Sequence, residues 1–251
     1  MPAATIQLKP GEEHNEHTYQ RHDLGTKGTS SDGRVFRYSK MGSTLGVAGN
    51  VYQGVVPIAN HLNRAADVVR AVGAQAVSFT DGGTGGGVDD FTEGYVYVND
   101  DAGEGHVYFV NRNYVASDAN AVFGSGAVAT FNIQNSVKVA LTTSSELTAV
   151  MNRYHEVIIH PSPNTAALVG VATHAQTAST FGWLQTGGPC AVLTDGTVVI
   201  AQHVRASDGT DGSVEALDRD GTNENEQELG VCMAVNATAE YSLIDLALDR
   251  G

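Results

Sequence analysis

The sequence predicts a mainly β protein, built of β-sandwich or β-barrel domains with an extended N-terminal arm and at most one short helix. Two observations lead to this fold class. Short apolar segments rich in Val and Thr alternate with turn residues along most of the chain, and 29 Gly accompany only 6 Pro among 251 residues. Segments of this length, separated by Gly, Asp and Asn, are typical of strands in sandwiches and barrels.

Residues 1–32 are polar and have no periodicity, so we expect them to form the arm. Residues 1–40 hold six Lys or Arg and five Asp or Glu, whereas the rest of the chain holds eight and 23. A near-neutral arm therefore precedes an acidic body. Two interpretations stay open, a solvated tail and an arm that orders on an adjacent subunit. In the second interpretation the basic residues are the partner contacts, namely Lys9, Arg21, Lys27, Arg34 and Arg37.

The first elements after the arm are a strand at Arg34–Tyr38, an extended segment at Leu45–Pro57 and a strand at residues 74–80. Between them, Asn60–Gly73 is the one helix candidate, because its apolar residues follow helical spacing and Gly73 could end it. Two adjacent valines in this segment favour a strand, and that alternative stays open.

The clearest hairpin joins Glu93–Val98 to His106–Val110 through a turn rich in Gly and Asp. Tyr95 and Tyr97 share one face of its first strand, and cross-strand aromatic contacts are expected to stabilise it. Further strands are predicted at residues 127–133, 136–141 and 145–150, and at Val157–Ile159.

Pro161–Pro163 is the predicted boundary between a β-rich domain, residues 33–160, and a C-terminal β-barrel or sandwich domain, residues 161–251. The predicted strands of this last domain are Leu168–His174, Ser179–Thr186, Cys190–Leu193, Thr197–Ala201, Leu229–Val235 and Tyr241–Leu248.

Motifs that could carry chemistry are weak, and we predict no catalytic residue, no cofactor site and no metal site. His155 and His160 are five residues apart, which places them on different sides of either a helix or a strand. The glycine-rich segment Asp81–Gly87 lacks the Lys of a phosphate-binding loop and is flanked by acids, which favours a loop tip. Gly124–Gly126 does not have the spacing of a serine nucleophile motif.

The acidic segment Asp208–Glu228 has alternating oxygen ligands at residues 218–226, but it lacks the spacing of an EF-hand, so a solvated loop is favoured over a weak divalent-cation site. Cys190 and Cys232 both lie in apolar segments and are expected to be small buried thiols, while their pairing stays open. Trp183, the single Trp, is expected to be a core residue, with a sugar-binding face as the alternative.

The formal net charge of −14 opposes binding to nucleic acid and to anionic membranes, so neither is a predicted partner. The sequence shows neither a secretory signal nor a stretch of about 20 apolar residues, so synthesis in a host cytoplasm is expected.

Several segments taken together suggest a family: Asp32–Tyr38, Pro57–His61, Glu93–Asp100 with Gly103–His106, Val139–Thr143, and Phe181–Pro189 with Val192–Gly196. They resemble virion structural proteins of tailed bacteriophages, in particular those encoded beside the major capsid gene. The resemblance covers about residues 30–250 and includes no catalytic motif.

This resemblance implies a non-enzymatic cement or decoration protein on the outer surface of the capsid. Its partners would be the major capsid protein and further copies of itself, in trimers. The five basic residues Lys9, Arg21, Lys27, Arg34 and Arg37 would contact the capsid. Two alternatives stay open. One is a tail- or fibre-associated protein with a glycan- or receptor-binding β module, and the other is an enzyme of β-helix or barrel type.

Overall fold

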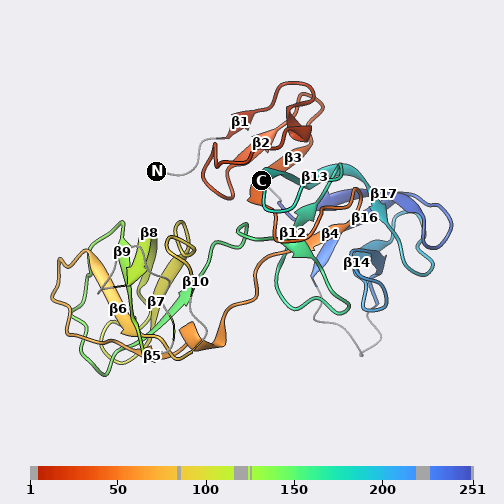
Figure 1. Cartoon of the computed structure of the whole chain (residues 1–251). Coiled ribbons are helices and arrows are strands. Elements are labelled where there is room, and N and C mark those ends of the chain that lie inside the picture. Colours follow the sequence, from red (N-terminus) through yellow and green to blue (C-terminus); the bar gives the residue numbers. More distant parts are fainter. Residues whose placement is uncertain (1–4, 84–85, 116–123, 125, 219–226, 250–251) are drawn as a thin grey trace. The chain divides into compact units, whose positions relative to one another are not determined.

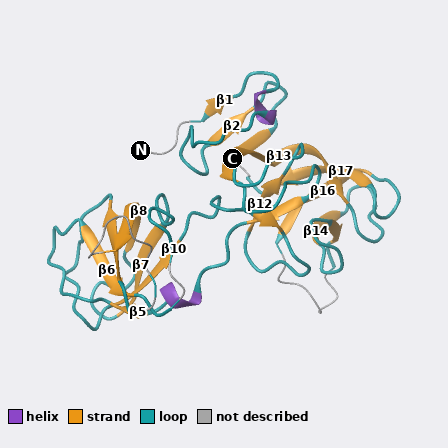
Figure 2. Cartoon of the chain, viewed as in Figure 1, coloured by secondary structure: helices purple, strands orange, loops and turns teal. Residues whose placement is uncertain are grey.

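The computed structural model describes residues 5–83, 86–115, 124, 126–218 and 227–249, and it is mainly β, as predicted (Figures 1 and 2). The chain forms two compact units. Unit 1 comprises Met1–Val55 and Arg153–Gly251, and unit 2 comprises Val56–Asn152. These boundaries differ from the predicted domains 33–160 and 161–251. The reason is strand pairing, because strands before residue 56 pair with strands after residue 157.

Unit 1 contains one sheet of 11 strands, with β1-β2-β3-β13-β17-β16-β14-β15 as its main path and β11, β4 and β12 joined to one side. Its elements are β1 (Ile6–Gln7), the short 3₁₀ helix η1 (Glu12–His14), β2 (Lys27–Thr29), β3 (Val35–Lys40), β4 (Val51–Gln53), β11 (Ile158–Ile159), β12 (Leu168–Val171), β13 (Phe181–Leu193), β14 (His203–Ala206), β15 (Val214–Ala216), β16 (Glu228–Ala234) and β17 (Tyr241–Ala247).

Strand β13 is the central element of unit 1, and it unites two strands that the sequence predicts separately. Its first half pairs with β3 and its second half with β17. The strand changes partner at Gly187–Pro189, where Gly188 has a φ of +80°. The buried amide of Gln185 donates hydrogen bonds to the carbonyls of residues 187, 188 and 189. This side chain thus fixes the backbone where the strand changes partner.

The predicted N-terminal arm is not a separate extended element: residues 5–32 belong to unit 1 and contain β1, η1, β2 and the turns between them. β1 pairs with β2, and β2 pairs with β3, so strand pairing begins at Ile6. Leu8 and Leu24 are buried in the core with Tyr38 and Trp183. Burial of each Leu stabilises the attachment by about 1.5–3 kcal/mol.

Unit 2 is a six-stranded sheet in the order β5-β10-β7-β8-β9-β6. An isolated bridge between Ala66 and Phe79 connects its first and last strands, so the sheet is nearly closed as a barrel. Phe79, Phe91 and Phe131 pack against one another inside it. Its elements are the 3₁₀ helix η2 (Ala59–His61), β5 (Arg64–Ala65), β6 (Ala76–Thr80), β7 (Tyr95–Asp100), β8 (Val107–Val115), β9 (Val128–Ile133) and β10 (Glu146–Val150).

The predicted hairpin is confirmed as β7 and β8. Tyr95 and Tyr97 share its outer face, where Tyr95 contacts Phe109 across the strands with ring centroids 5.7 Å apart. Tyr108 faces the opposite way and is buried.

The helix predicted at Asn60–Gly73 is wrong. Only η2 is helical there, and Asn63 has a φ of +53°, which breaks any helical run. Downstream, the N–H groups of Ala66 and Arg70 donate to carbonyls of residues 145 and 141, so the backbone is satisfied by pairing across the barrel. Two predicted strands are also absent: residues 136–141 form only a bridge at Leu141, and Thr197–Ala201 is an irregular segment that ends in a turn.

Candidate functional site

Two of the five predicted contact residues, Arg34 and Arg37, are engaged within unit 1. Arg34 contacts Glu13 at 3.2 Å and Asp32 at 2.8 Å. Arg37 donates to both carboxylate oxygens of Asp249, at 2.6 and 2.8 Å, and to the carbonyl of Gly25. These side chains therefore fasten the N-terminal segment to the rest of unit 1, and the partner contact predicted for them stays a prediction.

The other three predicted contact residues, Lys9, Arg21 and Lys27, are exposed or half-buried. The backbone of Lys9 is fixed, because its N–H donates to the Glu12 carboxylate at 2.9 Å. Lys27 lies on β2 beside β3. Arg21 lines a pocket.

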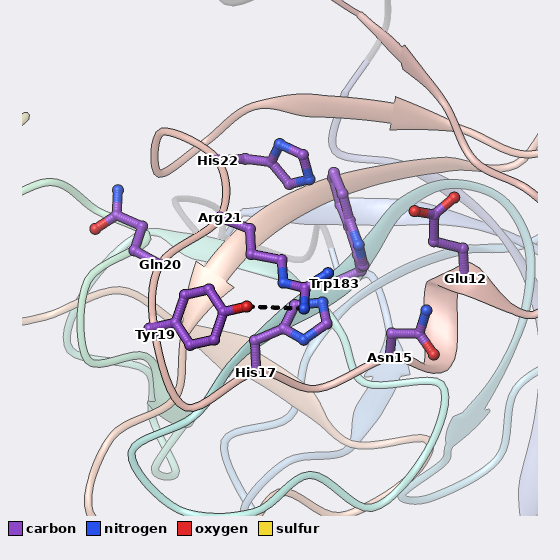
Figure 3. Close-up of a pocket in the computed structure, with 8 residues that line it drawn as sticks. All are labelled: Glu12, Asn15, His17, Tyr19, Gln20, Arg21, His22 and Trp183. Atoms are coloured by element: carbon purple, nitrogen blue, oxygen red, sulfur yellow. Dashed lines mark hydrogen bonds between the residues drawn. The ribbon is translucent and has the colours of Figure 1, made fainter.

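This pocket is open, has a volume of about 520 Å³ and is lined by Glu12, Asn15, His17, Tyr19, Gln20, Arg21, His22 and Trp183 (Figure 3). All its lining residues but one come from the N-terminal segment. The guanidinium of Arg21 lies over the ring of Tyr19, 5.2 Å from its centroid, and donates to the Tyr19 hydroxyl at 2.9 Å. Figure 3 shows Arg21 near the middle, with His17 beside it and His22 next to Trp183.

The backbone that carries the pocket is fixed on both sides. His17 and Phe181 exchange backbone hydrogen bonds of 2.9 and 2.8 Å. The N–H of Arg21 donates to the buried Tyr38 hydroxyl at 3.2 Å. Just before this stretch, the Glu16 carboxylate accepts from the Thr177 N–H at 2.8 Å and from the Thr180 hydroxyl. Although burial raises the pKa of Glu16, these hydrogen bonds bring it below its usual value.

The pocket brings three basic side chains together in an acidic protein. The pKa of His17 is lowered, first by burial and then by the nearby positive charges of Arg21 and His22, although Glu12 raises it. Arg21 and His22 thus lie close enough to His17 to oppose its protonation, in a chain of net charge −14.

Trp183 is a core residue, which confirms the favoured prediction. It is only 2% exposed and packs edge-on against Tyr38, with ring centroids 5.1 Å apart. His22 covers it from another side at 5.6 Å. A sugar-binding face requires an accessible ring, and this ring is covered.

The two histidines His155 and His160 do not line this pocket. His155 lies 3.2 Å from the Lys40 amine, whereas His160 contacts the carbonyls of Pro161 and Ser213. In the part of the chain that the structure describes, no three His, Cys, Asp or Glu side chains gather in a way that could hold a metal ion.

The glycine-rich segment Asp81–Gly87 is described except for residues 84 and 85. Its Asp81 is buried beside His61, 3.3 Å away, so this end of the segment holds a carboxylate inside the barrel. The calcium-like stretch 218–226 lies, apart from Asp218, outside the described residues, as does Ser125 of Gly124–Gly126. Earlier in the acidic segment, Asp208 and Glu215 both contact the buried Arg205.

Cys190 and Cys232 are free and buried, as predicted. Both are register partners of Ile244, one on each side of β17. Two strand spacings, about 9–10 Å, separate them, which exceeds the reach of a disulfide. The open question of their pairing is therefore answered by the register.

Sequence reasoning identified Arg21 but missed the neighbours that complete its pocket, His17, Tyr19 and His22. They lie in the segment predicted to be an unpatterned arm, and no local motif distinguishes them.

Comparison with models of known protein families, with curated proteins and with solved structures finds no match to the chain. Within the described residues, no helix has the length and apolar character that a membrane crossing requires.

Proposed function

We propose that this chain is a non-enzymatic bacteriophage cement protein that binds the outer surface of a capsid lattice and ties neighbouring major capsid subunits together. The observation that supports this proposal best is the uneven distribution of charge along the chain. Residues 1–40 are near neutral, with six Lys or Arg against five Asp or Glu, and present Lys9, Arg21 and Lys27, while the rest of the chain is strongly acidic. An uneven charge distribution orients a protein on a partner of complementary charge and accelerates association.

Net negative charge also favours the outer surface of the capsid over the inner one. Packaged DNA would repel a chain of net charge −14, whereas the outer face carries no such polyanion. The segment resemblance to virion proteins points the same way.

Unit 1 offers a second contact surface on the outer face of β13, β17 and β16. Tyr241, Leu243 and Met233 are exposed there, and the exposed Ala191 is the register partner of Leu243. Apolar side chains grouped on one sheet face are typical of subunit interfaces. We assign this face to contacts between copies, in the trimers that a three-fold lattice position would require.

A second candidate function is a tail or fibre module that binds glycans. One observation favours it: Tyr95 and Tyr97 are exposed on the same outer face of β7 in unit 2. Replacing both by Ser would abolish glycan retention if this candidate holds, and would leave capsid binding intact if the cement protein is correct.

Capsids of the encoding virus, stripped of this protein, provide the test. Purified chain should co-sediment with them in a saturable amount and raise the temperature at which they rupture. The variant Lys9→Gln/Lys27→Gln, matched against Lys138→Gln in unit 2, should bind more weakly and with less dependence on salt. No co-sedimentation at any salt concentration would refute the cement function.

A further inference from the structure

The pocket around Arg21 has the chemistry of an anion site. A guanidinium has five N–H donors. Within the described residues, the guanidinium of Arg21 donates one hydrogen bond, to the Tyr19 hydroxyl. His17 and His22 supply two more positive or hydrogen-bonding groups in the same pocket. An anion bound among them would offset the effect of Arg21 and His22 on His17.

The charge of the lining favours a carboxylate over a phosphate. The planar fork of an Arg matches the oxygens of either group. The one acid of the lining, Glu12, lies at the other end of the pocket from Tyr19 and opposes a dianion more strongly than a monoanion (Figure 3).

The surroundings favour a protein ligand over a sugar acid. The only Trp is covered by His22 and Tyr38, so it offers no stacking platform for a pyranose ring. Tyr19, 60% exposed at the rim, has Arg21 on one ring face and presents an aromatic surface of the kind enriched in protein interfaces.

We propose that the pocket formed by His17, Tyr19, Arg21 and His22 binds an acidic side chain, Glu or Asp, of a partner protein, with Arg21 as its bidentate donor. The site rests on the geometry of unit 1 alone. Only the identification of that partner as a neighbouring capsid subunit rests on the proposed function.

Binding of a carboxylate is coupled to protonation of His17. The groups that face His17 are Arg21, His22, Tyr19 and Glu12 of its own segment. From β13, the non-titrating Phe181 pairs with the His17 backbone and Trp183 lines the same pocket, while Tyr38 of β3 packs on His22. The pKa of His17 is lowered by burial and by its positive neighbours, so a bound anion raises it. The complex therefore takes up a proton, and affinity increases as the pH falls through the His range.

Trp fluorescence of this chain comes from the pocket alone, because Trp183 is its only Trp and lines the pocket. We would titrate the full chain with an acetylated, amidated peptide of alternating Glu and Ala, and follow Trp fluorescence together with the His17 ring resonances. The matched peptide has Gln in place of Glu. Inorganic phosphate and glucuronate are the competing probes.

The Glu peptide should saturate the signal, bind at least tenfold more tightly than the Gln peptide, and bind more tightly at pH 6 than at pH 8. Arg21→Gln should weaken it at least tenfold, and Arg21→Lys, which keeps the charge without the fork, should weaken it less. Lys27→Gln is the matched control, since Lys27 lies on the same segment outside the pocket. Far-UV circular dichroism establishes that each variant is folded.

Equal affinity for the Glu and Gln peptides would overturn the proposal, as would unchanged Glu-peptide binding by folded Arg21→Gln. Saturation by phosphate or glucuronate without a response to the Glu peptide would overturn it in favour of those ligands. Peptide binding without capsid binding would uphold the pocket and refute the cement function, so the two failures are distinguishable.

Discussion

Arg37 on β3 holds Asp249, near the C-terminal end of the chain, through two parallel hydrogen bonds of 2.6 and 2.8 Å. The same guanidinium donates to the Gly25 carbonyl at 2.7 Å. One side chain thus joins the N-terminal segment, the central sheet and the C-terminal end. Both partners are mostly buried, so solvent screens their interaction only in part.

Asp249→Asn should destabilise unit 1 by about 1–3 kcal/mol, because Arg37 would lose its charged acceptor. Urea unfolding at pH 7 measures this loss. The matched control is Asp245→Asn on the exposed face of β17, which should change stability by less than about 0.5 kcal/mol. Equal effects of the two variants would contradict a specific role for the pair.

The Arg37–Asp249 pair also predicts a pH dependence. Hydrogen bonds from Arg37 lower the pKa of Asp249, in spite of burial. Its stabilisation is therefore complete above the usual Asp pKa of about 4 and is lost as the pH falls through the lowered folded value. The difference in stability between wild type and Asp249→Asn should shrink from pH 7 to pH 3, and a constant difference would count against the pair.

Neither cysteine should react with a thiol reagent in the folded protein. Burial raises the pKa of Cys190 to about 12 and raises that of Cys232 as well, so little thiolate forms at pH 8. Ellman's reagent should find two thiols in denaturant and none that react rapidly in native buffer. Fewer than two thiols in denaturant under non-reducing conditions would show that a disulfide does form.

A core substitution should destabilise only the unit that contains it, because the hydrophobic clusters of the two units share no residue. Phe131→Ala in unit 2 should cost about 3–5 kcal/mol and Leu184→Ala in unit 1 about 2–5 kcal/mol. Hydrogen exchange resolves the effect by segment. Each variant should accelerate exchange in its own unit, and acceleration spread evenly over both would indicate a single cooperative unit.

The buried His61 should make unit 2 sensitive to mild acid. Burial lowers the pKa of His61, and Arg64 lowers it further, although Asp81 raises it. The folded state therefore binds a proton less readily than the unfolded state. Stability of unit 2 is greatest above pH 6.5 and falls toward pH 5, by at most about 1.4 kcal/mol per pH unit.

His61→Gln removes this titrating group and should flatten the pH dependence of unit 2, measured by hydrogen exchange of the Phe79 and Phe131 amides. His106→Gln, which changes a half-buried His of the same unit, is the matched control and should leave the dependence unchanged. A steep dependence in His61→Gln would assign the effect to other groups.

The fold class followed from the sequence because strand signals are local. Alternation in Glu93–Val98 and the Gly-rich turn after it define the β7–β8 hairpin without any distant contact. The helix at Asn60–Gly73 failed for the opposite reason. Its apolar residues have helical spacing, but the backbone of Ala66 and Arg70 pairs with segments more than 70 residues away.

The site was predictable only in part. Arg21 stood out as a positive charge in an acidic chain, but Trp183 reaches the pocket from β13, far along the sequence. Arg37 illustrates the same limit, because its partner Asp249 is separated from it by 212 positions. Charge alone could not distinguish an Arg that anchors the segment from one that lines a pocket.

The measurement that tests the central claim most directly is electron microscopy of stripped capsids after addition of the full chain, with Arg21→Gln and Lys138→Gln assembled in parallel. The account predicts density at regular positions of the outer lattice, with full occupancy for the wild type and Lys138→Gln and reduced occupancy for Arg21→Gln. Absence of ordered density on the capsid for the wild-type chain would contradict it.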